Sequence, residues 1–170
     1  ASDVYKRQNY GRLEKNPIDT IEANLLLPLK IIYAASISNV KCFINTDTIL
    51  DKRINHYSLS KKQFLSWLET YSNNLTCVNV ALEHFYGPGD DPSKFVTMMI
   101  KEMLNNSEEI NLTAGEQKRD FIYIDDVVNA FMIILKHMSS QKNGFYEYEV
   151  GSGSNVKIKS LVKLIKELSK

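Results

Sequence analysis

The chain is short of the residues that bind metals or cross-link secreted proteins. It has two cysteines and three histidines among 170 residues, at spacings that match no metal-ligand pattern, so we expect no metal site. Cys42 and Cys77 each lie in an apolar, strand-like run, which indicates buried, reduced thiols. Reduced thiols are typical of a cytoplasmic protein, and we predict that localisation.

An excess of charge is also missing. The net charge of +1 predicts no nucleic-acid partner and no anionic membrane surface as a partner. We expect that no apolar run is long enough to span a bilayer, and we find no secretory pattern at the start of the sequence. Hydrophobic residues make up 44% and charged residues 24% of the chain, which is the composition of a soluble globular domain.

Glycines are few, and none forms the glycine-rich turn that binds dinucleotides. Gly87-Pro88-Gly89 and Gly151-Ser152-Gly153 each begin like that motif. However, Pro92 and Val156 stand where the third glycine is needed. The sequence printed here therefore lacks a recognisable cradle for a pyrophosphate.

The first half of the chain alternates predicted helices and strands. Helical spacing predicts a helix over residues 18–38, which Pro28 should kink or break, and a second over 56–71. Apolar, β-branched runs predict strands at 42–44, ending at Thr46-Asp47-Thr48, and at 77–82. This alternation is typical of a parallel sheet covered by helices, where the chemistry lies at the carboxyl ends of the strands.

The second half begins with a turn-rich segment, residues 86–92. After it we predict helices over 93–104, 125–137 (with Asp125 as its cap) and 156–168, and strands at 110–113, 121–124 and 146–151.

Tyr57 and Lys61 are four residues apart on a predicted helix and so share one helix face. A nearby cation lowers the pKa of a tyrosine from about 10, and such a tyrosine can exchange a proton with a substrate oxygen near neutral pH. The spacing alone is weak, because roughly one such pair is expected by chance. The alternative is an ordinary amphipathic helix with Tyr57 half buried and Lys61 in solvent.

Five segments, in their order and spacing, resemble the extended short-chain dehydrogenase/reductase family of nucleotide-sugar enzymes, also called NAD-dependent epimerase/dehydratases. They are residues 22–24, 43–48, 57–61, 85–89 and 119–127. The resemblance implies NAD or NADP as cofactor and a nucleotide-diphosphate sugar as substrate. The stretch from Ala81 to Val128 is similar to makers of deoxy and dideoxy sugars and favours a CDP-sugar.

The resemblance also implies roles for single residues. Tyr57 would be the acid and base at the sugar C4 oxygen, Lys61 would hold the nicotinamide ribose and lower the tyrosine pKa, and Thr46 would hydrogen-bond the same sugar oxygen. Arg119 would grip the diphosphate with its forked guanidinium; without the family it would be a surface charge. Asn24 would shape the helix beside the cofactor; the alternative is a local bond to the helix backbone.

Two positions depart from the family pattern. Its dehydratases have Asp-Glu directly after the catalytic threonine, whereas this chain has Asp47-Thr48. Without the glutamate, a base for water elimination is missing, so we expect hydride transfer at C4 rather than 4,6-dehydration. Asp47 and Thr48 are still expected to contact substrate, as is His84, which stands where the family often has an asparagine.

The expected fold class is α/β, the C-terminal part of a Rossmann-like parallel sheet plus the start of a smaller α/β substrate domain. We interpret residues 1–8 as a sequencing artefact or tag and 9–85 as a partial NAD(P)-binding domain. Residues 86–170 would be the nucleotide-sugar region with interleaved Rossmann elements. The family's glycine-rich turn would precede residue 9, so we expect these 170 residues alone to bind neither NAD nor NADP usefully and to have no turnover.

The predicted complete protein is an NAD(P)-dependent 4-ketoreductase or epimerase of deoxysugar or O-antigen-type biosynthesis. Two alternatives stay open: a nucleotide-sugar 4,6-dehydratase, and a catalytically silent binding or scaffold domain of the same fold. The resemblance also implies a homodimer, paired through the tyrosine helix and the helix before it.

Overall fold

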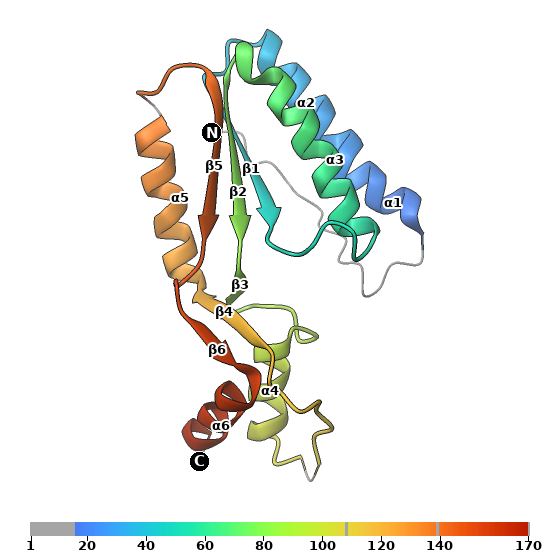
Figure 1. The fold of residues 1–170 in the computed structure, drawn as a ribbon, viewed down its shortest axis with the longest axis vertical. Helices are drawn as coiled ribbons and strands as arrows, with labels where there is room; N and C mark the ends of the chain where they lie inside the picture. The colour runs from blue at the N-terminus through green and yellow to red at the C-terminus, as the bar shows by residue number, and fades with distance from the viewer. Residues whose placement is uncertain (1–15, 108, 139, 170) are drawn as a thin grey trace. The chain divides into compact units, whose positions relative to one another are not determined.

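The computed structural model describes residues 16–107, 109–138 and 140–169, so the interpretation of residues 1–8 lies outside the described part. The chain divides into two compact units (Figure 1). The first ends at Leu82 and takes in Ile134–Glu149; the second comprises Glu83–Ile133 and the residues from Val150 onward. The predicted domain division at residue 85 stays a prediction.

The first unit contains a three-stranded sheet in the order β1 (Cys42–Thr48), β2 (Thr76–Leu82), β5 (Gly144–Val150). β1 and β2 are parallel, with Cys42 opposite Thr76 and Thr48 opposite Leu82, and β5 runs the same way (Figure 1). Helices α2 (Leu27–Ile37) and α3 (His56–Thr70) cover one face, and the 3₁₀ turn Tyr71–Asn73 ends α3. The predicted α/β class with a parallel sheet is confirmed.

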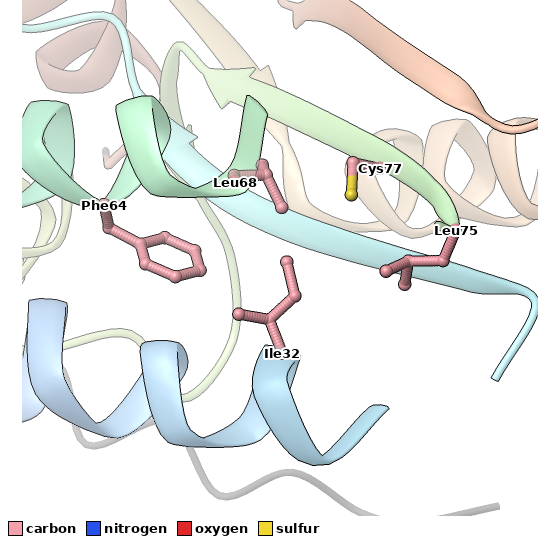
Figure 2. Close-up of a cluster of buried hydrophobic side chains, with 5 residues drawn as sticks. All are labelled: Ile32, Phe64, Leu68, Leu75 and Cys77. Atoms are coloured by element: carbon pink, nitrogen blue, oxygen red, sulfur yellow. The ribbon is translucent and has the colours of Figure 1, made fainter. Parts of the chain in front are cut away.

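The core of this unit lies between the two helices and the beginnings of the strands (Figure 2). Phe64 and Leu68, one turn apart on α3, meet Ile32 of α2 and Cys77 of β2, all fully buried. Phe43 of β1 joins them, with its ring centroid 6.2 Å from that of Phe64. Burying such side chains contributes roughly 1.5–3 kcal/mol each.

The helix before the sheet is continuous but not uniform. It runs through α1 (Pro17–Ile21), a π-helical turn η1 (Glu22–Leu26) and α2. Pro28 has no N–H to donate to the carbonyl of Asn24, and just before it the Leu27 N–H bonds to the Glu22 carbonyl, five residues back. The kink predicted at Pro28 therefore takes the form of a widened turn that contains Asn24.

By length and composition alone, the helix Pro17–Ile37 could cross a membrane, contrary to our expectation that no run is long enough. This is weak evidence, because the core helix of a soluble protein passes the same test. The helix buries Ile32 and Ala35 on the side of α3, together with the polar Thr20 and Asn24. We interpret it as a packed helix of the α/β unit.

The second unit has a mixed sheet in the order β3 (His84–Tyr86), β4 (Lys118–Tyr123), β6 (Asn155–Lys157), with β3 parallel and β6 antiparallel to β4. Helices α4 (Phe95–Leu104) and α6 (Ile158–Leu168) pack on each other. Helix α5 (Ile124–Met138) begins in this unit and ends in the first.

Two predictions for this unit are wrong. Residues 110–113 form no strand: Leu112 is 42% exposed, and a strand is stable only beside a partner that takes its backbone hydrogen bonds. Asp125 does not cap α5, because the helix already begins at Ile124; the carboxylate instead lies in the first turn, where the helix dipole favours it.

Asp120 of β4 holds the turn that follows β5. Its carboxylate is nearly buried and accepts hydrogen bonds from the Ser152 N–H (3.0 Å), the Ser152 hydroxyl (2.5 Å) and the Gly153 N–H (2.8 Å). Gly153 has φ +74°, a backbone conformation that glycine adopts without strain. Burial alone would raise the pKa of Asp120, but these hydrogen bonds outweigh it and leave the pKa below its ordinary value.

We therefore expect Asp120→Asn to destabilise the protein at neutral pH by about 1–3 kcal/mol. Because the folded-state pKa is depressed, the carboxylate's contribution is present above the unfolded value of about 3.9 and is lost as the pH falls through the folded value. Urea unfolding between pH 7 and about pH 3 measures the difference in the free energy of unfolding between wild type and variant. This difference should shrink on acidification. Exposed Glu69→Gln serves as the control; a difference independent of pH would contradict the charge argument.

Candidate active site

The site begins where α3 starts. The Asn55 side chain caps the helix by accepting the Ser58 N–H at 2.8 Å, so the first turn carries Tyr57 and the second Lys61. Both side chains are buried, Lys61 to 1% exposure. The alternative of an ordinary helix with Lys61 in solvent is therefore wrong.

Lys61 joins the helix to the strand. Its Nζ donates to the backbone carbonyl of Thr46 at 2.7 Å and lies 5.7 Å from the centre of the Tyr57 ring. Thr46 is two residues before the end of β1, so this cluster sits at the carboxyl end of a parallel strand. The structure thus brings the lysine ammonium to the backbone of Thr46 and to the ring of Tyr57. A phenol beside an ammonium can hold and move a proton on a substrate oxygen, and the role of the Thr46 hydroxyl stays a prediction.

Asn24 contributes to a second polar group between the helices. Its amide, the Thr20 hydroxyl and the Ser58 hydroxyl are all buried, and none of them has a hydrogen-bond partner among the described residues. The alternative predicted for Asn24, a local bond from its side chain to the helix backbone, is therefore not observed. Its role beside a cofactor stays a prediction.

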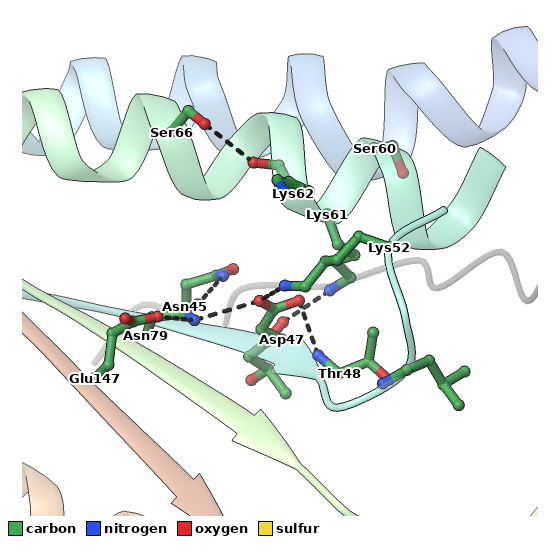
Figure 3. A network of polar contacts seen from close by, with 12 residues as sticks. Asn45, Asp47, Thr48, Lys52, Ser60, Lys61, Lys62, Ser66, Asn79 and Glu147 are labelled. Atoms are coloured by element: carbon green, nitrogen blue, oxygen red, sulfur yellow. Dashed lines mark hydrogen bonds and ion pairs between the residues drawn. The ribbon is translucent and has the colours of Figure 1, made fainter. Parts of the chain in front are cut away.

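A buried polar network crosses the sheet beside Lys61 (Figure 3). The Asp47 carboxylate pairs with the Lys52 ammonium and accepts the Thr48 N–H at 2.8 Å and the Asn79 amide at 3.2 Å. Asn79 also donates to Glu147 of β5 at 3.2 Å. Its amide oxygen accepts the Asn45 amide at 2.8 Å.

Sequence reasoning missed Lys52, Asn79 and Glu147. The available signal was polar residues at alternate positions of apolar strands, Asn45 and Asp47 on β1 and Asn79 on β2, which share a sheet face. For Asp47 and Thr48 the structure records internal partners: the Asp47 side chain is 1% exposed, and the Thr48 hydroxyl accepts the Leu50 N–H at 3.3 Å. Their predicted contacts with substrate stay predictions.

His84 and Arg119 belong to the second unit. His84 begins β3, its Nδ1 lies 3.3 Å from the Glu83 carboxylate, and its ring packs 5.7 Å from that of Phe121 on β4. Arg119 is exposed on β4 and donates to the Lys118 carbonyl at 2.8 Å. Both predicted substrate contacts are thus carried by adjacent strands of one sheet.

The glycine pairs do not form a phosphate cradle. At Gly87 a Cβ would lie 2.4 Å from Ile124 Cγ2, so this glycine allows close packing of β3 against the start of α5. At Gly151 a Cβ would lie 2.7 Å from the Asp120 carboxylate, which already uses the N–H groups of that turn. Among the described residues, neither glycine pair therefore offers a turn for a pyrophosphate, and the contact of Tyr57 and Lys61 with a nicotinamide stays a prediction.

Within the described ranges, no three His, Cys, Asp or Glu side chains are grouped as metal ligands would be.

A parallel sheet with a buried Tyr–Lys pair at its carboxyl edge places the chain among Rossmann-like α/β proteins. It belongs to the NAD dependent epimerase/dehydratase family, whose model matches residues 5–151. CDP-abequose synthase from Salmonella muenchen is 36% identical over 174 residues, covering 96% of this chain and 58% of that protein. dTDP-4-dehydro-6-deoxyglucose reductase from Escherichia coli is 25% identical over 97% of this chain and 56% of its own length.

Among solved structures, RMD from Pseudomonas aeruginosa complexed with NADPH superposes with a TM-score of 0.80 at 19% identity, over 95% of this chain and 63% of that one. At this identity the likeness shows the fold. The chain spans less than two thirds of the length of each of these proteins.

Asn79 separates two carboxylates, and this arrangement yields a prediction. Asn79→Asp replaces a shared donor by a third anion, so we expect a loss of about 1–3 kcal/mol in the free energy of unfolding at pH 7. The loss should shrink on acidification as the new group, whose reference pKa is about 3.9, is protonated. Urea unfolding at pH 7 and at an acidic pH measures this loss, with exposed Asn74→Asp as the control. Equal losses in the two variants would show that the network does not discriminate against a carboxylate at position 79.

Proposed function

We propose that the complete protein containing this chain is an NAD(P)-dependent nucleotide-sugar enzyme that transfers hydride at sugar C4. It would act as a 4-ketoreductase or epimerase in deoxysugar or O-antigen-type biosynthesis. The observation that carries the proposal is the buried Lys61, whose ammonium meets the Thr46 carbonyl and faces the Tyr57 ring.

The residues at the strand end divide the chemistry among them. The nicotinamide, when bound, supplies or accepts the hydride. Tyr57 gives a proton to the C4 oxygen during reduction and takes it back during oxidation. Lys61 favours the ionised phenol electrostatically and can hydrogen-bond the nicotinamide ribose. Thr46, whose hydroxyl both donates and accepts, orients the C4 oxygen.

The contacts of Asp47 support hydride transfer over 4,6-dehydration. All three of its recorded partners, on Lys52, Thr48 and Asn79, are N–H donors, so the carboxylate acts as an acceptor within the protein. The next residue, Thr48, has no carboxylate that could remove a proton beside a ketone. The pair that elimination needs is therefore incomplete, because Asp47 is present but engaged with its own sheet and Thr48 stands in place of the glutamate.

The relatives support the substrate class. Two of them carry names that refer to CDP- and dTDP-linked deoxysugars, and one of these is a reductase of a 4-dehydro sugar. We propose a nucleotide-diphosphate sugar as substrate, with a CDP-sugar favoured, and NAD or NADP as cofactor. The exposed guanidinium of Arg119 is suited to the diphosphate, and His84 to a sugar or phosphate oxygen.

The test uses the full-length enzyme with nucleotide-linked 4-keto-deoxysugars and follows NADH or NADPH by absorbance. We expect Tyr57→Phe to lower turnover by about 10²–10⁴-fold with substrate binding retained, because only the proton carrier is lost. Arg119→Ala should instead weaken substrate binding, with exposed Arg53→Ala as the control.

Wild-type turnover in Tyr57→Phe would refute the acid/base role. A 4-keto-6-deoxy product formed from a nucleotide hexose without net use of cofactor would identify a dehydratase. Substrate binding without any turnover in the wild type would identify a silent binding domain.

We also propose that the protein is a homodimer paired through the outer faces of α2 and α3. Both helices carry exposed apolar side chains, among them Tyr33 and Ile37 on α2 and Trp67, which is 48% exposed, on α3. Trp67→Glu should weaken self-association by at least about 10-fold, since an unpaired charge in an interface costs several kcal/mol. Sedimentation velocity measures it against Glu69→Gln; a monomeric wild type, or an unaffected Trp67→Glu dimer, would refute this surface.

A further inference from the structure

The loop of residues 49–55 connects the strand that carries Thr46 to the helix that carries Tyr57. One side chain ties this loop to the sheet: the Lys52 ammonium pairs with the Asp47 carboxylate. The Lys52 side chain is 21% exposed and that of Asp47 is 1% exposed. Because the pair is largely desolvated, losing one partner leaves an uncompensated charge in the interior, unlike the loss of a surface ion pair.

We call the Lys52–Asp47 pair the tether, and its Asp47 end belongs to the sheet. Asp47 is fixed on β1 by the Thr48 N–H and the Asn79 amide, and Asn79 is itself held by Asn45 and Glu147 (Figure 3). The carboxylate therefore cannot follow the loop without breaking hydrogen bonds that cross three strands.

The other end of the tether leads directly to the tyrosine. The Ile54 N–H bonds to the Asp51 carbonyl at 3.1 Å, so the chain turns tightly around Lys52. Asn55 then caps α3, and Tyr57 follows two residues later. With Lys52 held at Asp47, few free backbone angles separate the anchored point from the first turn of α3.

We infer that Lys52 is a positioning residue of the active site. By pairing with Asp47 it sets where α3 begins, and thereby where the Tyr57 hydroxyl lies relative to Thr46 and Lys61. Lys52 itself acts through the loop and need not touch the reacting atoms. The inference rests on the proposed function, in which Tyr57 moves the proton.

The kinetic test compares Lys52→Met, Lys52→Arg and Lys62→Met in the full-length enzyme. Lys62 is an exposed lysine on α3 and provides the matched control. Lys52→Met should lower kcat by about 10–100-fold, because a misplacement near 1 Å can cost that much. Lys52→Met should change the KM of the nucleotide sugar little. It should move the limb of the pH–kcat profile that reports Tyr57 to higher pH. Lys52→Arg should recover most of kcat. Equal kcat and equal pH profiles in Lys52→Met and Lys62→Met would overturn the inference.

A second measurement does not depend on activity. In the wild type, an amine-reactive ester followed by mass spectrometry should modify Lys52 at least about fivefold more slowly than Lys62, because the paired, buried amine is withheld from the reagent. Asp47→Asn should abolish that protection. Equal labelling of the two lysines overturns the tether even if Lys52→Met fails to fold. Protection without turnover on any nucleotide sugar instead leaves the tether standing and refutes the proposed function.

Discussion

An ammonium group that is almost fully buried must find partners, and at Lys61 the backbone of β1 provides one. Desolvating a charge costs several kcal/mol unless the interior offers compensating contacts. The Thr46 carbonyl and the Tyr57 ring are such contacts, and they constrain how α3 can sit on the sheet. A rotation of α3 that moved Lys61 off the carbonyl would also lift Phe64 from Phe43, because both side chains face the strands. In the first unit, the same placement of α3 on the sheet therefore determines both the core packing and the site geometry.

The elements that sequence predicted well are those whose signal is local. The tyrosine helix was expected over 56–71 and is found as His56–Thr70, because its apolar period and its end residues lie within the segment itself. β3 and β6 were missed because each has three residues and exists only through pairing with β4. Residues 110–113 show the reverse case, in which a short apolar pattern found no partner strand.

In the site, too, the features with a local sequence signal were predictable and those with distant partners were not. The pairing of Tyr57 with Lys61 follows from helical spacing, and Thr46 could be placed at a strand end from the apolar run before it. The contacts of Asp47 could not be foreseen, because its partner Asn79 is 32 residues away and Glu147 lies 68 residues beyond Asn79. A motif identified Asp47 as a candidate substrate contact, which stays a prediction, and the structure adds that its carboxylate is engaged with its own sheet. Asp120 was likewise seen only as part of a motif, since the turn that it holds comes 32 residues later.

The sheet face toward the helices changes character along its strands, and this has a consequence for misfolding. Phe43 and Cys77 are apolar where α2 and α3 press on them, whereas Asn45, Asp47 and Asn79, further along, are polar. A two-residue slip of β1 along β2 would keep every side chain on its own face, so alternation alone does not prevent it. Such a slip would carry Asn45 into the place of Phe43, or Phe43 into the place of Asn45, leaving an amide or a carboxylate without its partner. The polar residues Asn45, Asp47 and Asn79 thus favour one register of β1 on β2 during folding.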